Sequence, residues 1–157
     1  MSTAPKKPFD PDMFFRLAGS IVRDPKSDDA ELRTAISRAY YAVFLTARDA
    51  LFGLDEQSST AELRKIISKK HHLKFGGKPN KPLNSHSRII FSVLDKTSNY
   101  ALYQQLDQLK EARVRADYKR DDKCLLEVGK NSWREYAEEN MQLAASILPL
   151  TKRLTRY

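Results

Sequence analysis

The chain has 157 residues, enough to bury one hydrophobic core and too few to make two ordinary domains the expectation. Charged residues make up 31% and hydrophobic residues 41%, a balance that excludes a disordered or fibrous chain. Lysine and arginine outnumber aspartate and glutamate by 28 to 20, and the net charge of +8 favours an anionic partner, either nucleic acid or an anionic membrane surface.

Cysteine usage and hydropathy narrow the class further. The single cysteine, Cys124, excludes an internal disulfide and a multi-cysteine zinc site within one chain, and it fits a reducing compartment. No stretch has the roughly 20 apolar residues that a membrane span requires, and the N-terminal segment lacks the apolar core of a signal peptide. We expect a cytoplasmic protein with a flexible basic arm over residues 1–9 and a single domain over residues 10–157.

Helix signals begin directly after this arm. Asp10 followed by Pro11 predicts an N-cap and a first-turn proline, and the Asp24-Pro25 step ends the helix. A longer second helix is predicted over residues 28–53, because a capping box opens it and apolar residues recur at three- and four-residue steps. This second helix is the strongest secondary-structure signal in the chain.

The next segment predicts a short helix and a loop. Ser59 and Glu62 have capping-box spacing, and the helix that they open is expected to fray at the histidine pair His71-His72. Two glycines and two prolines then predict a surface loop over residues 73–84.

The remaining elements are also helical. Helices are predicted over residues 85–97 and 100–118, followed by a charged turn and a last helix that starts near Ser132 and is kinked at Pro149. No alternating strand pattern of useful length appears. The fold class expected is therefore all-α, an up-and-down bundle of about five to six helices.

Two segments carry a family resemblance. The sequence R-A-Y-Y-A-V-F spans residues 38–44 in the second predicted helix, and R-V-R-A-D-Y spans residues 113–118 at the end of the fifth. In this order, about 70 residues apart and followed by a capped helix, they resemble the HEPN family over roughly residues 28–154.

The resemblance implies a HEPN-like bundle, usually dimeric, with two copies of the arginine motif meeting in a cleft between the subunits. Many HEPN proteins are metal-independent endoribonucleases of toxin–antitoxin pairs, CRISPR effectors and anti-phage systems, and the clade with the A-D-Y form often sits beside a nucleotidyltransferase antitoxin. The partners implied are RNA, a second copy of the chain and a nucleotidyltransferase or antitoxin. No cofactor and no metal are expected.

The sequence departs from the family signature, in which a histidine follows the arginine after four to six residues. Tyr118 stands after a four-residue spacer from Arg113, and no histidine follows later in the chain. The leading interpretation is a metal-independent endoribonuclease of toxin or anti-phage type, or a degenerate relative. The alternatives are a non-catalytic HEPN module that binds RNA or a nucleotide, and an interaction subunit of a toxin–antitoxin or nucleotidyltransferase system.

Three motif residues are the catalytic candidates. Metal-independent RNA cleavage needs a base for the 2′-hydroxyl, an acid for the leaving oxygen and a cation for the phosphorane. Arg113 supplies a permanently charged fork that matches phosphate. Tyr118 can donate a hydrogen bond or a proton, although unperturbed phenols titrate near pH ~10 and imidazoles near ~6.5. Asp117 can orient Arg113 or act as a base, and a purely structural i, i+4 ion pair is the alternative.

Basic residues in two clusters are the candidates for binding RNA phosphates, with solvated surface charge as the alternative. Arg115, Lys119 and Arg120 lie around the motif, and Lys74 and Lys78 lie around the glycine- and proline-containing loop. Arg38 is a separate candidate, because a charged residue on an otherwise packed helix face can point into the shared cleft. Phe75, within the lysine-containing loop, could stack on a base. The adjacent His71 and His72 make a poor metal pair, and His86 is expected to be a solvated histidine at a helix end, with a general base as its alternative role.

Overall fold

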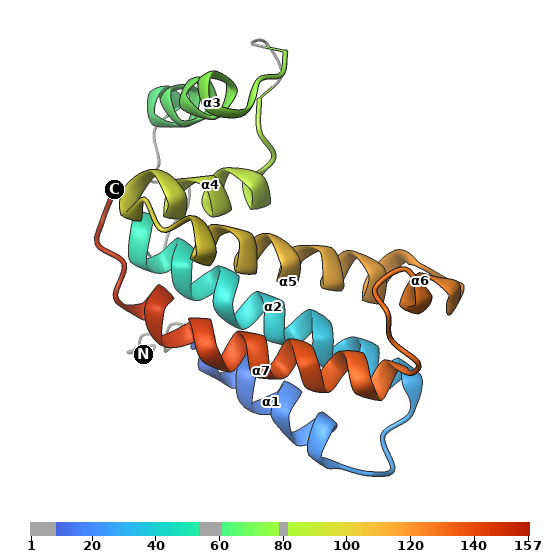
Figure 1. The fold of residues 1–157 in the computed structure, drawn as a ribbon. Helices are drawn as coiled ribbons and strands as arrows, with labels where there is room; N and C mark the ends of the chain where they lie inside the picture. Colours follow the sequence, from blue (N-terminus) through green and yellow to red (C-terminus); the bar gives the residue numbers. More distant parts are fainter. Residues whose placement is uncertain (1–8, 54–60, 79–81) are drawn as a thin grey trace, which may run out of the picture.

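All regular secondary structure is helical in the computed structural model, which describes residues 9–53, 61–78 and 82–157 (Figure 1). The described part of the chain holds seven helices and no strand, which confirms the all-α prediction. The helices are α1 (Asp12–Arg23), α2 (Asp29–Phe52), α3 (Ala61–Phe75), α4 (Ser85–Thr97), α5 (Tyr100–Tyr118), α6 (Lys123–Leu126) and α7 (Trp133–Lys152). None of these described helices is long and apolar enough to cross a membrane.

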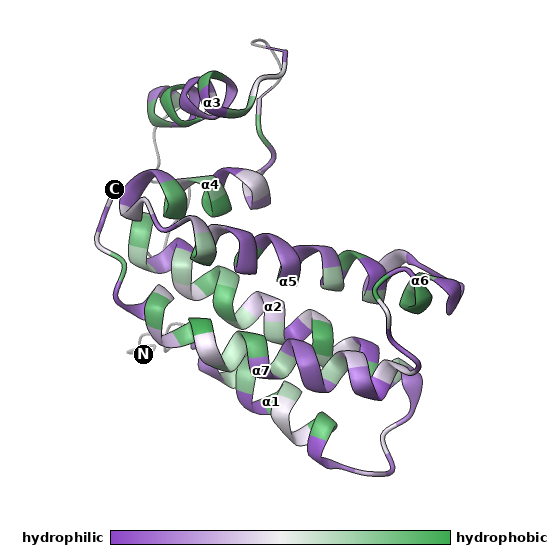
Figure 2. Cartoon of the chain, in the orientation of Figure 1, coloured by the Kyte–Doolittle hydropathy of each residue, from purple (hydrophilic) through white to green (hydrophobic). Residues whose placement is uncertain are grey.

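The long helix α2 lies at the centre of the bundle. It packs against α1, α4, α5 and α7, and α1, α2, α5 and α7 alternate in direction, as an up-and-down bundle requires (Figure 1). Figure 2 shows α2 carrying much more hydrophobic colour than the neighbouring α5. Small side chains at the helix crossings allow this close packing, and they are fully or almost fully buried: Ala35, Ala39, Ala42 and Ala47.

Cap residues explain where the main helices begin. The predicted capping box of α2 is confirmed, because the Asp28 carboxylate accepts from the Glu31 backbone N–H while the Glu31 carboxylate accepts from that of Asp28. At α7, Ser132 accepts from the Glu135 N–H at 3.1 Å, but Glu135 reaches back to the N–H of residue 131 instead of completing the box. Helix α7 continues through Pro149 to Lys152.

Helix α3 differs from the prediction at its end. It runs to Phe75, so residues 73–75 are helical and the predicted loop over 73–84 was too long; Ser59, the predicted cap, lies outside the described residues. Phe75 anchors the last turn by stacking on Tyr103, with ring centroids 5.7 Å apart. Gly76, at φ +77°, then ends the helix in the left-handed conformation that glycine adopts without strain.

The segment that joins α5 to α7 is ordered by one buried side chain. It contains the single-turn helix α6, where the sequence indicated only a charged turn. The Trp133 indole is buried, and its Nε1–H donates to the Asp122 carboxylate at 2.9 Å. A second apolar cluster around Trp133 therefore closes the end of the bundle at which the R-V-R-A-D-Y motif lies.

Candidate functional site

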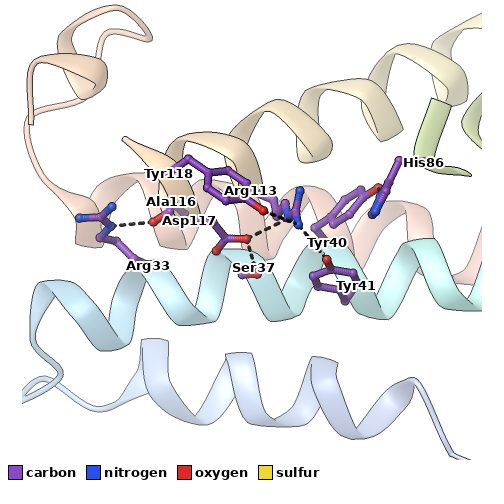
Figure 3. Close-up of polar contacts among 9 residues, drawn as sticks. All are labelled: Arg33, Ser37, Tyr40, Tyr41, His86, Arg113, Ala116, Asp117 and Tyr118. Atoms are coloured by element: carbon purple, nitrogen blue, oxygen red, sulfur yellow. Dashed lines mark hydrogen bonds and ion pairs between the residues drawn. The ribbon is translucent and has the colours of Figure 1, made fainter. Parts of the chain in front are cut away.

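The site is built where the C-terminal half of α5 faces α2. Arg113 and Asp117 are one helical turn apart on α5, and the Arg113 Nε lies 2.9 Å from the Asp117 Oδ2. Ser37 of α2 adds a hydrogen bond of 3.3 Å from its hydroxyl to the same carboxylate oxygen. The carboxylate therefore fixes the arginine on one side and is itself tied to the central helix (Figure 3).

Two phenols hold the other side of the guanidinium. The Arg113 Nη2 donates to the Tyr41 hydroxyl of α2 at 2.9 Å and to the Tyr118 hydroxyl at 3.5 Å. Its Cζ also lies 5.4 Å from the centre of the Tyr41 ring and 5.3 Å from that of Tyr118, which are cation–π distances. Only 14% of the Arg113 side chain is exposed, whereas 66% of Tyr118 is exposed. Tyr118 thus stands at the surface over a positioned, nearly buried cation.

The surroundings keep this cation charged. Burial alone would lower the pKa of Arg113, but the neighbouring Tyr41, Asp117 and Tyr118 outweigh it, so the pKa of the guanidinium is raised. Arg113 therefore stays protonated in a partly water-excluded place, and the Asp117 carboxylate 2.9 Å away balances part of its charge.

A histidine that the sequence did not connect to the motif lies next to it. The His86 Nδ1 of α4 is 2.6 Å from the Tyr40 hydroxyl, and its ring stacks on Phe44 with centroids 4.6 Å apart. It also meets the edge of Tyr41 at 6.1 Å, so it is one side chain away from Arg113. The expectation of a solvated histidine is wrong, since His86 is packed among the aromatic residues of α2. Because His86 is far from the motif in sequence, the sequence alone does not indicate that the two lie close together.

A second unexpected residue holds the end of α5 in place. The Arg33 Nε of α2 donates to the carbonyl oxygen of Ala116 at 2.8 Å, and its Nη2 donates to the carbonyl oxygen of Lys119. Its guanidinium also lies 4.8 Å from the centre of the Trp133 ring. The last carbonyls of a helix lack partners within the helix, so Arg33 caps α5 where the motif lies (Figure 3).

The predicted phosphate-binding residues do not all gather at this site. Lys119 and Arg120 are exposed directly after α5 and lie beside the motif. Arg115 is on another face of α5, near Tyr136: burial raises the pKa of the Tyr136 phenol, and the nearby Arg115 opposes part of that rise. Arg38 turns toward α1, with its Cζ 4.7 Å from the centre of the Phe14 ring.

The remaining candidates lie at the opposite end of the fold. Lys74 is exposed on the last turn of α3, and Lys78 is exposed shortly after that helix. Phe75 stacks on Tyr103, so it does not stand free to receive a base.

The described residues contain no group of three or more histidine, cysteine or acidic side chains that could hold a metal ion. His71 packs edge-on against Phe91 at 5.1 Å, so this histidine too is packed. Comparisons of the chain with protein-family models, with curated proteins and with solved structures find no match. The Arg113 site thus consists of a positioned arginine framed by one carboxylate and two phenols, and a guanidinium fork is chemically suited to bind an anion.

Proposed function

We propose that the chain is a HEPN-type protein that acts on RNA, and that it cleaves RNA without a metal at the Arg113 site. The observation that carries the proposal is the guanidinium of Arg113, which is oriented by Asp117 and Tyr41 and covered by the exposed Tyr118. Its planar fork matches a phosphate, and the orientation is set before any ligand binds. The surplus of positive charge on the chain supports an anionic polymer as the ligand.

The chemistry that fits these groups is attack of an RNA 2′-hydroxyl on the adjacent phosphorus. This attack forms a 2′,3′-cyclic phosphate, and the P–O5′ bond breaks to release a 5′-hydroxyl. Arg113 binds the extra negative charge of the phosphorane, and Tyr118 supplies the proton to the leaving oxygen. Asp117 uses Oδ2 to orient Arg113, and we assign its other oxygen, Oδ1, as the acceptor of the 2′-hydroxyl proton.

Binding without cleavage is the second candidate, and one observation favours it. Asp117 is already engaged by Arg113 and by Ser37, which fits a carboxylate that positions a cation better than one that accepts a proton. In that case Arg113 anchors a phosphate and the phenols around it set the shape of the site. The two candidates share the same residues and differ only in whether a product forms.

A homodimer belongs to the same proposal. The resemblance implies that two motifs face each other, and the 66% exposure of Tyr118 leaves this phenol available to a second copy of the chain. Light scattering during size-exclusion chromatography would measure the mass directly. A nucleotidyltransferase or antitoxin partner, in the setting of toxin or anti-phage defence, is a further part of the proposal; co-purification would test it.

The deciding experiment incubates the purified protein with total tRNA and with a single-stranded RNA in the presence of EDTA. We expect wild-type protein to yield fragments that end in a cyclic phosphate. Arg113→Lys should slow cleavage by about 100-fold or more, because lysine keeps the charge but loses the fork. Tyr118→Phe should slow it comparably if the phenol supplies the proton.

Arg16→Lys is the matched control, since Arg16 is exposed on α1 and contacts none of the site residues described above; it should cleave like the wild type. If the wild-type protein binds RNA in a salt-dependent way but yields no fragment, the proposed function becomes RNA binding without cleavage. If folded wild-type protein neither cleaves nor binds RNA, both candidate functions are refuted.

A further inference from the structure

A groove separate from the Arg113 site lies between α3 and α4. Its volume is about 790 Å³, a size typical of ligand sites. One wall is a face of α3 that includes Lys65, Lys69 and Leu73, and the other is formed by Leu83 and the first turns of α4. Figure 1 shows α3 standing at one end of the bundle above α4.

The groove is lined by basic and aliphatic side chains. Lys65 and Lys69 are exposed on α3, Arg88 lines the groove from α4, and no acidic residue is among the described residues that line it. The aliphatic part of the lining is Leu73, which is 78% exposed, together with residues 82 and 83, a proline and a leucine. An exposed leucine surrounded by cations suits a ligand that carries both negative charge and apolar surface.

This groove and the Arg113 site share the N-terminal turn of α4. His86 points from that turn into the bundle, where it contacts Tyr41, the partner of Arg113. Arg88, two residues further on, lines the groove. Because residues two apart on a helix point to different sides, α4 contacts the Arg113 site on one side and the groove on another.

From this arrangement we infer that the groove binds single-stranded RNA that continues from the Arg113 site. The inference rests on the proposed function. Lys65 and Lys69 hold backbone phosphates, and an unstacked base packs against the exposed Leu73. The substrate class is therefore an RNA with an unpaired stretch long enough to reach from α5 across α4 to α3, and not a nucleotide bound at Arg113 alone.

An acidic, leucine-bearing peptide would also complement this lining, but RNA is favoured for two reasons. Both places contact α4, through Arg88 at the groove and through His86 beside Tyr41, so one strand that crosses this helix satisfies both. A histidine ring, that of His72, also lines the groove, and histidine and arginine planes are surfaces on which unpaired bases stack.

The test compares the binding of labelled oligoribonucleotides of about four and about sixteen nucleotides, the lower and upper ends of typical single-strand sites. The double variant Lys65→Gln/Lys69→Gln should reduce the slope of log affinity against log salt by about 1.4 for the long RNA, which is about 0.7 for each phosphate that is no longer neutralised. Its affinity for the short RNA should stay unchanged. The control Arg16→Gln/Lys26→Gln removes two exposed charges at the α1 end of the molecule and should alter neither.

An uncharged variant separates a shaped groove from general attraction. Leu73→Ser should weaken binding of the long RNA about threefold or more, as expected when a stacked or packed base loses part of its support. Met13→Ser, on α1 with 55% exposure, is the matched control and should have no effect.

The outcomes distinguish this inference from the proposal on which it rests. If both RNAs bind equally, the groove variants have no effect and Arg113→Ala abolishes binding, the groove is excluded and the proposed function stands. If neither RNA binds, both fail. If an acidic amphipathic peptide binds and the groove variants weaken that binding while leaving the binding of the long RNA unchanged, the groove is a protein-docking surface and the inference is overturned.

Discussion

The adjacent tyrosines of α2, Tyr40 and Tyr41, form hydrogen bonds with different partners. Successive helix positions point about 100° apart, so the Tyr40 hydroxyl meets His86 of α4 while the Tyr41 hydroxyl meets Arg113 of α5. Tyr40 is fully buried, and burial raises the pKa of its phenol far above the usual value. Tyr40 therefore stays protonated and serves as a hydrogen-bonding partner of His86, whereas Tyr41 belongs to the Arg113 site.

Removing each hydroxyl should separate stability from ligand binding. Tyr40→Phe leaves the His86 Nδ1 without its phenol and should lower the free energy of unfolding by about 1–2 kcal/mol, with little change in RNA affinity. Tyr41→Phe loosens Arg113 and should weaken RNA binding several-fold at nearly unchanged stability. Urea denaturation and RNA titration of both variants check this; equal effects of the two on RNA binding would contradict the division of roles.

At this scale the sequence indicated only the part of the site that is local. The spacing of Arg113 and Asp117 on one helix predicts their ion pair, because residues four apart share a face. Ser37, Tyr41 and His86 reach the same place from two other helices. Such encounters depend on how the helices pack, and nothing in a single sequence specifies that packing.

At the scale of the helix, the end of α5 is defined by a side chain from another element. The carbonyls of Ala116 and Lys119 receive the Arg33 guanidinium, and this guanidinium rests against Trp133 at the start of α7. Arg33 thus joins α2, α5 and α7 at the turn that carries Asp117 and Tyr118. Arg33 is a positioning residue, because it acts on the site only by holding the end of α5 in place.

Replacement of Arg33 by methionine keeps the length of the side chain but removes both hydrogen bonds. We expect a loss of about 2 kcal/mol in unfolding free energy, as for hydrogen bonds made by a charged group. Amide hydrogen exchange near residues 115–119 should accelerate more than exchange in α1. Arg23→Met, an exposed arginine in the last turn of α1, provides the comparison. Uniform acceleration across all helices would argue against a local cap.

Side-chain caps made the starts of α2 and α7 predictable, whereas the end of α3 was missed. Side chains cap a helix N-terminus through contacts three residues away, so Asp28 and Ser132 mark α2 and α7 correctly. The extension of α3 to Phe75 depends on stacking with Tyr103 from α5, a contact between residues far apart in sequence. A basic, polar stretch without strong periodicity therefore resembles a loop until its tertiary partner is known.

At the scale of the whole molecule, α3 is the least integrated of the longer helices. It is held to α4 by an ion pair of 2.9 Å between Lys70 and Asp95 and to α5 by the stacking of Phe75 on Tyr103, and its one buried side chain is Ile67. The Tyr157 hydroxyl also donates to the Asp95 carboxylate, and Asp95 in turn raises the pKa of Tyr157, already raised by burial, to about 12. Helices α2, α4, α5 and α7 contribute most of the main core, to which α3 adds only one buried residue, Ile67.

This architecture predicts that α3 opens before the bundle does. Native-state hydrogen exchange should show lower protection over residues 61–75 than in α2, α5 and α7. Phe75→Ala should reduce α3 protection by a further factor of about five, equivalent to ~1 kcal/mol for removal of an aromatic pair, and leave the other helices unchanged. Leu17→Ala, half-exposed on α1, is the control. Protection of α3 equal to that of α2 would show one cooperative unit.

The position of Trp133 also makes its fluorescence an intrinsic probe of one end of the molecule. It is the only tryptophan in the sequence, it is buried, and it contacts the guanidinium that caps α5. Light absorbed by its indole is therefore emitted from the end of the bundle that bears Arg113, and not from α3 or its groove. The wavelength and intensity of that emission follow the order of the α5–α7 connection without any label, so this end of the protein can be observed in solution separately from α3.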